Sequence, residues 1–129
     1  MKLRNALLSA VIFGLAAAPL VARAEGDWKK GRIYFRMVCT ACHTDKAGAA
    51  IPPVGRTKAE WKAYLTADKH AKGKDSVKYY VSQKYRESIA DSNKAAAKFV
   101  SEPDAQLMED VAAFIMRSAK DGEVPASCN

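Results

Sequence analysis

Five consecutive residues, Cys39 to His43, carry the most specific chemistry in this 129-residue chain. They read Cys-Thr-Ala-Cys-His, so two thiols are separated by two residues and followed at once by an imidazole. This spacing is typical of covalent attachment of a c-type haem. Each thiol adds to one haem vinyl group, the gap matches the separation of the two vinyls, and the histidine follows as the proximal iron ligand. We therefore predict one covalently bound haem c, held by Cys39, Cys42 and His43.

Two other kinds of chemistry use the same residue types. A thioredoxin-like dithiol is expected in a βαβ setting, and nothing strand-like precedes Cys39. A structural zinc ion needs four nitrogen or sulfur ligands. The sequence offers one such set, namely Cys39, Cys42, His70 and Cys128. That set lacks the second closely spaced ligand pair of ordinary zinc modules, so the spacing favours haem.

Residues 1–24 have the three-part pattern of a secretory signal peptide. Lys2 and Arg4 precede an apolar run over residues 6–20, and residues 22–24 (Ala-Arg-Ala) are suited to cleavage. The alternative is a retained membrane anchor, but a spanning helix needs roughly 20 apolar residues and this run is shorter. We expect cleavage after residue 24 and no membrane span in the mature chain. Because this kind of haem is attached outside the cytoplasm in bacteria, the pattern predicts a periplasmic protein.

Residues 25–129 are expected to form a single domain. Loss of the leader removes three of the 21 Lys and Arg residues and none of the 14 Asp and Glu residues, which lowers the formal net charge from +7 to +4. A mildly basic surface of this kind would steer docking onto an acidic protein. The lysines are scattered rather than arranged in a stripe, which argues against nucleic acid as a partner.

The remaining sequence has the periodicity of helices. Residues 27–39 predict a first helix that Asp27 caps. Gly31, Phe35 and Cys39 recur every four residues and therefore share one face. The glycine on that face would allow another backbone to come close.

Further helices follow an irregular segment at residues 44–55 that contains Gly48, Pro52 and Pro53. Thr57-Lys-Ala-Glu60 is a capping box and opens a short helix that carries Trp61. Periodic apolar residues predict a helix over residues 76–90, followed by a turn at 91–93 and a brief Ala-rich turn to Phe99. A last helix is expected to begin with a cap in residues 101–104 and to stop at Gly122. Its apolar stripe consists of Leu107, Met108, Val111, Phe114 and Ile115.

A helix with glycine and an aromatic before Cys-x-x-Cys-His, a proline loop after it, and a terminal amphipathic helix together resemble a class I cytochrome c. The resemblance covers essentially the whole chain after the leader and is most specific at its two ends. It implies an all-α fold wrapped around one covalent haem, with Gly31 and Phe35 meeting Val111 and Phe114 where the first and last helices cross.

The same resemblance assigns roles around the haem. It implies that Pro52 or Pro53 lies beside His43, near a backbone carbonyl that accepts a hydrogen bond from its Nδ1. It also implies that Trp61 packs on the haem edge and contacts a propionate. Tyr79, Tyr80 and Tyr85 are expected to pack on the distal side.

The sixth iron ligand is where the chain departs from the family. Class I cytochromes usually supply a methionine from the loop before the last helix, and this chain has no methionine between His43 and Met108. Met108 lies on the apolar stripe at the start of the last helix, near the usual position, whereas His70 is the only other histidine. Two histidine ligands would give a lower reduction potential than one histidine and one methionine. Met116 lies farther along the last helix and fits less well, so Met108, His70 and an open position all remain possible at this point.

The function these features predict is electron transfer without substrate chemistry. The expected partners are other cytochromes or an acidic-surfaced oxidoreductase, docked on the lysines between Lys58 and Lys78. An open sixth position would instead suit gas binding or weak peroxidase activity, but the sequence contains no distal His/Arg pair to support an enzyme. A haem subunit of a larger oxidoreductase is a further alternative.

Overall fold

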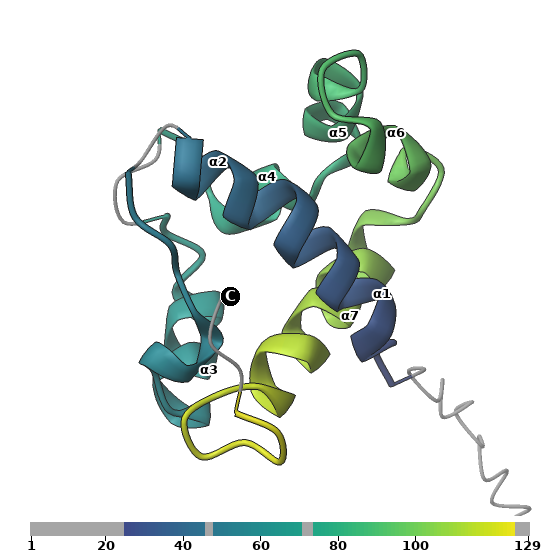
Figure 1. The fold of residues 1–129 in the computed structure, drawn as a ribbon. Helices are drawn as coiled ribbons and strands as arrows, with labels where there is room; N and C mark the ends of the chain where they lie inside the picture. The colour runs from purple at the N-terminus through teal and green to yellow at the C-terminus, as the bar shows by residue number, and fades with distance from the viewer. Residues whose placement is uncertain (1–24, 46–47, 71–73, 126–129) are drawn as a thin grey trace, which may run out of the picture.

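The computed structural model describes residues 25–45, 48–70 and 74–125. These residues form helices joined by loops and contain no strand, which confirms the predicted all-α class (Figure 1). The elements are α1 (Trp28–Tyr34), the π-helical η1 (Phe35–Cys39), α2 (Thr40–Asp45), the 3₁₀ turn η2 (Pro53–Gly55), α3 (Lys58–Ala67), α4 (Val77–Val81), α5 (Gln83–Ile89), α6 (Lys94–Phe99) and α7 (Asp104–Arg117). Within these ranges, no helix is both long and apolar enough to cross a membrane.

One hydrophobic core connects the first helix to the last. Its buried members come from α1, η1, α3, α4, α6 and α7 and from the residues just after α7. They are Tyr34, Phe35, Val38, Trp61, Val81, Ala96, Phe99, Leu107, Val111, Phe114, Ile115 and Ala119. Cys39, which is partly buried, packs against this core.

The start of α1 is fixed by two aspartates. The Asp27 carboxylate accepts hydrogen bonds from the backbone N–H groups of Lys29 and Lys30, as the predicted helix cap should. The backbone N–H of Asp27 in turn donates to Oδ1 of Asp110 at 2.7 Å. Asp110 is buried on α7, so the residue that caps the first helix is hydrogen-bonded to the last helix.

The helix formed by α1, η1 and α2 crosses α7 at close range (Figure 1). A Cβ added at Gly31 would lie 1.8 Å from the carbonyl oxygen of Asp110. One turn later, the rings of Phe35 and Phe114 pack with centroids 5.4 Å apart. The predicted meeting of Gly31 and Phe35 with the last helix is confirmed.

Gly31→Ala is expected to destabilise the protein. Alanine favours a helix over glycine by about 0.8–1.0 kcal/mol, but its Cβ would force the α1 and α7 backbones apart. Overpacking of this kind costs about 1–3 kcal/mol and occasionally more, so we expect a net loss of about 1–2 kcal/mol. The free energy of unfolding measured in denaturant tests this. Gly55→Ala is the matched control, because its Cβ would come no nearer than 4.0 Å to Pro52 Cγ; equal stability losses in the two variants would contradict the close crossing.

The first helix continues beyond the end that the sequence indicated. We expected it to stop at Cys39, but η1 passes directly into α2, which ends at Asp45. The residues from Thr40 to His43 include no glycine or proline that would stop a helix, and the breakers come later, at Gly48 and Pro52. The Cys-x-x-Cys-His segment thus lies on a helix, where residues three and four apart share a face.

The helix expected over residues 76–90 is two helices. Ser82 adopts an extended conformation (φ −66°, ψ 153°) between α4 and α5. Its hydroxyl donates to the carbonyl of Tyr79 at 2.7 Å and accepts from the N–H of Tyr85 at 3.3 Å. Serine side chains can hydrogen-bond to nearby backbone groups and so compete with a continuous helix. Here these hydrogen bonds accompany the break at Ser82, after which α5 runs in a new direction.

Arg86 connects α5 to the segment that leads into α7. Its fully buried guanidinium donates to the carbonyls of Phe99 and Glu102 and to the Asp104 carboxylate. The last helix begins at Asp104 with Pro103 in the capping position, and no side chain caps it. The helix was expected to end at Gly122, but it ends earlier, at Arg117.

Candidate cofactor site

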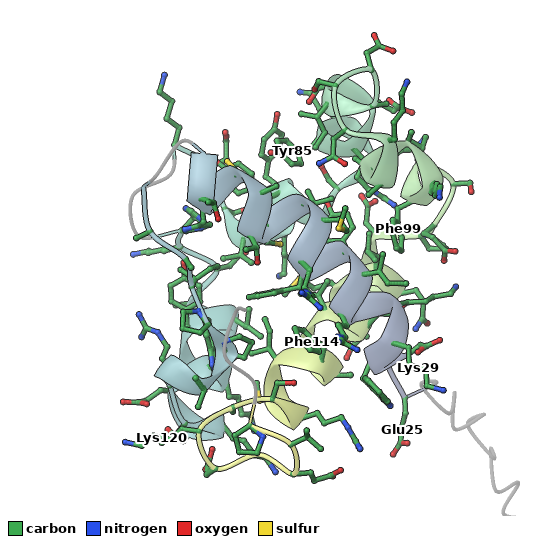
Figure 2. The ribbon with its side chains drawn as sticks, viewed as in Figure 1. Glu25, Lys29, Tyr85, Phe99, Phe114 and Lys120 are labelled. Carbon is green, nitrogen blue, oxygen red and sulfur yellow. The ribbon has the colours of Figure 1, made fainter. Side chains whose placement is uncertain are left out.

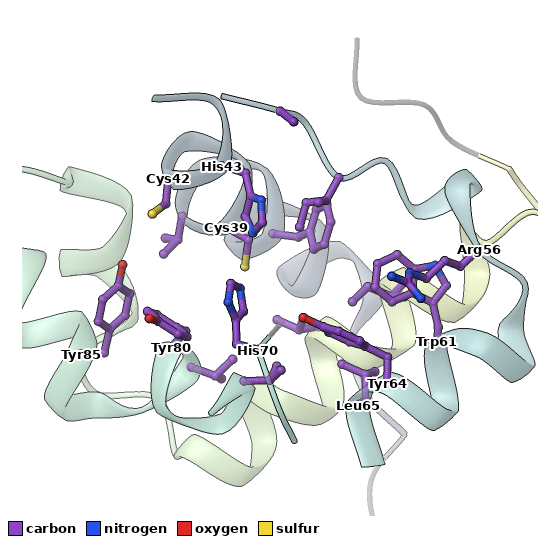
Figure 3. Close-up of a pocket in the computed structure, with 18 residues that line it drawn as sticks. Cys39, Cys42, His43, Arg56, Trp61, Tyr64, Leu65, His70, Tyr80 and Tyr85 are labelled. Atoms are coloured by element: carbon purple, nitrogen blue, oxygen red, sulfur yellow. The ribbon is translucent and has the colours of Figure 1, made fainter. Parts of the chain in front are cut away.

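A cavity of about 520 Å³ lies between the cysteine-bearing helix and the α3–α4 side of the molecule (Figure 3). Protein interiors are close-packed and contain few voids larger than a water molecule. A space of this size instead falls within the roughly 300–1,000 Å³ of small-molecule and cofactor pockets. Apolar side chains form most of its wall, among them Phe35, Val38, Ile51, Leu65, Val111 and Ile115.

The three residues of the predicted attachment motif all line this cavity. Cys39 is the last residue of η1, while Cys42 and His43 lie on α2. Spacings of three and four residues place them on one side of the helix, and this side faces the cavity (Figure 3). Both cysteines are free thiols and half-buried. Burial raises the pKa of Cys39 to about 12, an effect that the nearby Cys42 reinforces.

The surroundings of His43 favour the neutral form of its imidazole. Burial lowers its pKa below the usual value, the His70 ring lowers it further, and a hydrogen bond with the backbone of Ala49 opposes both effects. A neutral imidazole is the ligand form of histidine. The backbone partner that the resemblance placed near Pro52 or Pro53 is therefore supplied here by Ala49.

Trp61 is among the residues that line the cavity and Pro53 is not; the two residues contact each other. The indole Nε1 of Trp61 donates to the carbonyl oxygen of Pro53 at 2.7 Å, and both residues are buried. An indole has one N–H, so the structure gives this donor to Pro53 rather than to a propionate. Trp61 lines the cavity, where its ring provides an apolar surface for packing.

Arg56 is a cavity residue that the sequence reasoning missed. Its guanidinium carbon lies 5.5 Å from the ring centroid of Trp61 and 5.3 Å from that of Tyr64. These distances are within the range of cation–π attraction, which holds the cation at the end of the cavity opposite Tyr80 and Tyr85 (Figure 3). No sequence motif marks Arg56, because its role depends on rings that follow it on α3.

His70 faces the motif from the other side of the cavity (Figure 3). Its ring centroid is 5.5 Å from that of His43, with an angle of 52° between the planes. Its Nδ1 atom is buried and has no hydrogen-bond partner. Buried polar atoms in proteins are nearly always hydrogen-bonded, so this nitrogen is an exception that a ligand in the cavity would explain.

Aromatic residues from α4 and α5 pack beside His70, as expected for the tyrosines of this segment. The Tyr80 ring lies 4.9 Å from the His70 ring, and Tyr80 also contacts Tyr79 and Tyr85. The hydroxyl of Tyr34 donates to the carbonyl of Tyr80 at 2.6 Å. These contacts anchor the wall against which the His70 ring lies.

Met108 occupies a different part of the molecule from His43 and His70. It is half-buried on α7 and packs against the core, but it is not among the residues that line the cavity. Met116 likewise packs on the core outside that lining. The structure thus brings His43 and His70 together and does not bring a methionine to them.

Within the described ranges, no group of three or more His, Cys, Asp or Glu side chains is arranged to hold a metal ion. Cys128, the fourth member of the possible zinc set, lies outside those ranges, as do the leader residues 1–24.

Comparisons of the chain with protein-family models, curated proteins and solved structures found no match.

Proposed function

We propose that this protein is an exported electron carrier with one haem c bound covalently in the cavity. The observation that supports the proposal most is the position of the attachment motif, because Cys39, Cys42 and His43 all line one apolar space of about 520 Å³. A motif that lay on an exposed helix face would have no such space beside it. The leader and the periplasmic location belong to the proposal as well.

The chain would hold the haem through two thioether bonds, from Cys39 and Cys42, and through His43 as proximal ligand. The haem supplies the one-electron redox chemistry of its iron. The hydrogen bond with the Ala49 backbone would orient the His43 ring, as partners of metal-bound histidines do. The aliphatic and aromatic wall would exclude water, which is one way in which a protein sets a haem potential.

Arg56 would bind a carboxylate at the mouth of the site. Its side chain is exposed, yet the rings of Trp61 and Tyr64 fix it beside the cavity. Guanidinium–carboxylate hydrogen bonds are among the stronger ones in proteins. A haem propionate is the carboxylate that this position suits, and Arg56 would then make the contact that the resemblance gave to Trp61.

In this proposal, His70 would supply a second histidine ligand to the haem iron. It lines the cavity opposite His43 with an unpartnered, buried Nδ1, whereas Met108 lies outside the cavity lining. A pair of histidine ligands would leave no open position on the iron. This arrangement favours a carrier over a gas-binding protein or a peroxidase.

The purified, exported protein tests the proposal directly. We expect an intact mass that equals residues 25–129 plus one haem, and a pigment that stays with the chain in acid acetone. A redox titration should be reversible and follow a one-electron curve. A protein without covalent haem, or one that titrates as a two-electron dithiol, would contradict the proposed function.

A further inference from the structure

The outward side of the first helix exposes two large apolar side chains. Ile33 is 52% and Met37 53% exposed, and the only other large apolar residue so exposed in the described ranges is Val124, after α7. Residues four apart are neighbours on a helix surface, so Ile33 and Met37 form one small patch. The opposite side of this helix already packs on α7 through Gly31 and Phe35.

Basic side chains surround this apolar patch. Lys29, Arg32 and Arg36 are exposed, and their spacing from Ile33 and Met37 places them on the same side of the helix. The sequence contains no Asp or Glu between Asp27 and Asp45, so this stretch of the helix contributes positive charge only. Lys29 lies at the edge of the molecule at the start of α1 (Figure 2), with its Nζ 5.8 Å from the ring centroid of Trp28. We call Lys29, Arg32, Ile33, Arg36 and Met37 together the α1 face.

Lys30 lies apart from the α1 face, since its Nζ pairs with Glu102 at 3.1 Å, on the segment before α7. The backbone beneath the face is firmly held, since the carbonyl of Met37 accepts a hydrogen bond of 2.8 Å from Asn93 Nδ2 and the adjacent Val38 is buried. A partner would therefore meet a rigid surface, and little ordering would be needed on binding.

The lysines between Lys58 and Lys78 make a different kind of surface. Five of them are exposed, at positions 58, 62, 69, 74 and 78, and Lys72 lies outside the described ranges. Glu60, Asp68 and Asp75 are interspersed among them, and no large apolar side chain is exposed in this part of the described chain. Protein interfaces combine an apolar centre with a polar rim and are enriched in Met and Arg but depleted in Lys. The α1 face has that composition, and the lysine surface does not.

We propose that the α1 face is a docking surface for an acidic protein that carries an apolar patch among its carboxylates. The identity of the partner as an electron carrier rests on the proposed function. The docking surface itself does not rest on it. Met37 lies two residues before Cys39, so a protein bound here would lie against the helix that carries the cofactor. A face of five side chains suits the small interfaces, below about 1,200 Å², of transient redox encounters.

An anionic membrane is the less favoured partner. Each Lys or Arg near an anionic bilayer contributes about 1 kcal/mol, and only three such residues belong to the face. Two half-exposed apolar side chains add little to this, because covalent acyl chains far longer than Ile or Met give only marginal membrane binding.

The test uses ¹⁵N-labelled exported protein titrated with a synthetic helical peptide that presents a leucine pair flanked by glutamates. Amide shifts are expected to concentrate on residues 29–37.

Arg32→Glu with Arg36→Glu should raise the Kd of this peptide about five- to tenfold. Exposed ion pairs contribute about 0.2–1 kcal/mol each, and charge reversal adds repulsion. Ile33→Ser with Met37→Ser should also raise Kd, but should leave the weaker binding of an all-glutamate peptide unchanged. The matched charge control is Lys62→Glu with Lys69→Glu, for which we expect less than a twofold change.

Three results would overturn the inference. The first is a loss of affinity in the Lys62/Lys69 variant that equals or exceeds the loss in the Arg32/Arg36 variant. The second is an unchanged Kd after the Ile33/Met37 substitutions. The third is binding of the α1 face to phosphatidylglycerol vesicles but not to the peptide. Amide shifts report docking whether or not a haem is attached, so failure of this inference is distinguishable from failure of the proposed function.

Discussion

Replacing Cys39 and Cys42 together by alanine is expected to abolish covalent haem attachment and to leave the chain largely unfolded. Neither thioether bond can form in this variant, so acid acetone should extract all pigment that copurifies with the chain. The loss of structure follows from the size of the cavity. A small domain buries a limited fraction of its surface. In this variant, a space of about 520 Å³ lined by core residues would have no covalently bound occupant.

Acid-acetone partition, intact mass and far-UV circular dichroism measure the three parts of this result. Thr40→Ala is a control inside the motif, because its Oγ1 is buried and has no hydrogen-bond partner. Removal of an unpartnered hydroxyl should leave haem content unchanged and stability equal or slightly higher. A double-cysteine variant that folds normally and keeps its pigment covalently would disprove the central assignment.

The features that the sequence predicted correctly depend on residues close together in the chain or on a strong periodicity. The Asp27 cap and the capping box from Thr57 to Glu60 involve neighbours within three residues, and both are present. The crossing of Gly31 over α7 follows from a glycine on one buried helix face. In each case the physical cause is visible without knowledge of the tertiary fold.

The features that the sequence did not predict depend on contacts between distant segments. The break at Ser82 depends on its own hydroxyl, but serine alone seldom ends a helix. The burial of Arg86 requires carbonyls 13 and 16 residues away. The choice between His70 and Met108 was open for the same reason, since only the tertiary structure decides which of them reaches the cavity.

His70→Ala is expected to convert the iron from low spin to high spin, whereas Met108→Ala should leave it low spin. His70 lines the cavity across from His43, so its removal would take away the sixth ligand. Met108 packs against the core outside the cavity lining. Met→Ala changes in cores cost about 2–5 kcal/mol, and we expect about 2 kcal/mol for this half-buried side chain.

His70→Met distinguishes ligation from a general structural role of the histidine. Methionine with histidine raises the potential of a c-type haem, so this variant should regain a low-spin spectrum and titrate at a higher potential than the parent protein. The absorption spectrum gives the spin state, and a redox titration gives the potential. A high-spin Met108→Ala protein beside a low-spin His70→Ala protein would transfer the sixth-ligand assignment to Met108. Low-spin spectra in both variants would exclude both residues, because the iron would then hold a ligand from elsewhere in the chain.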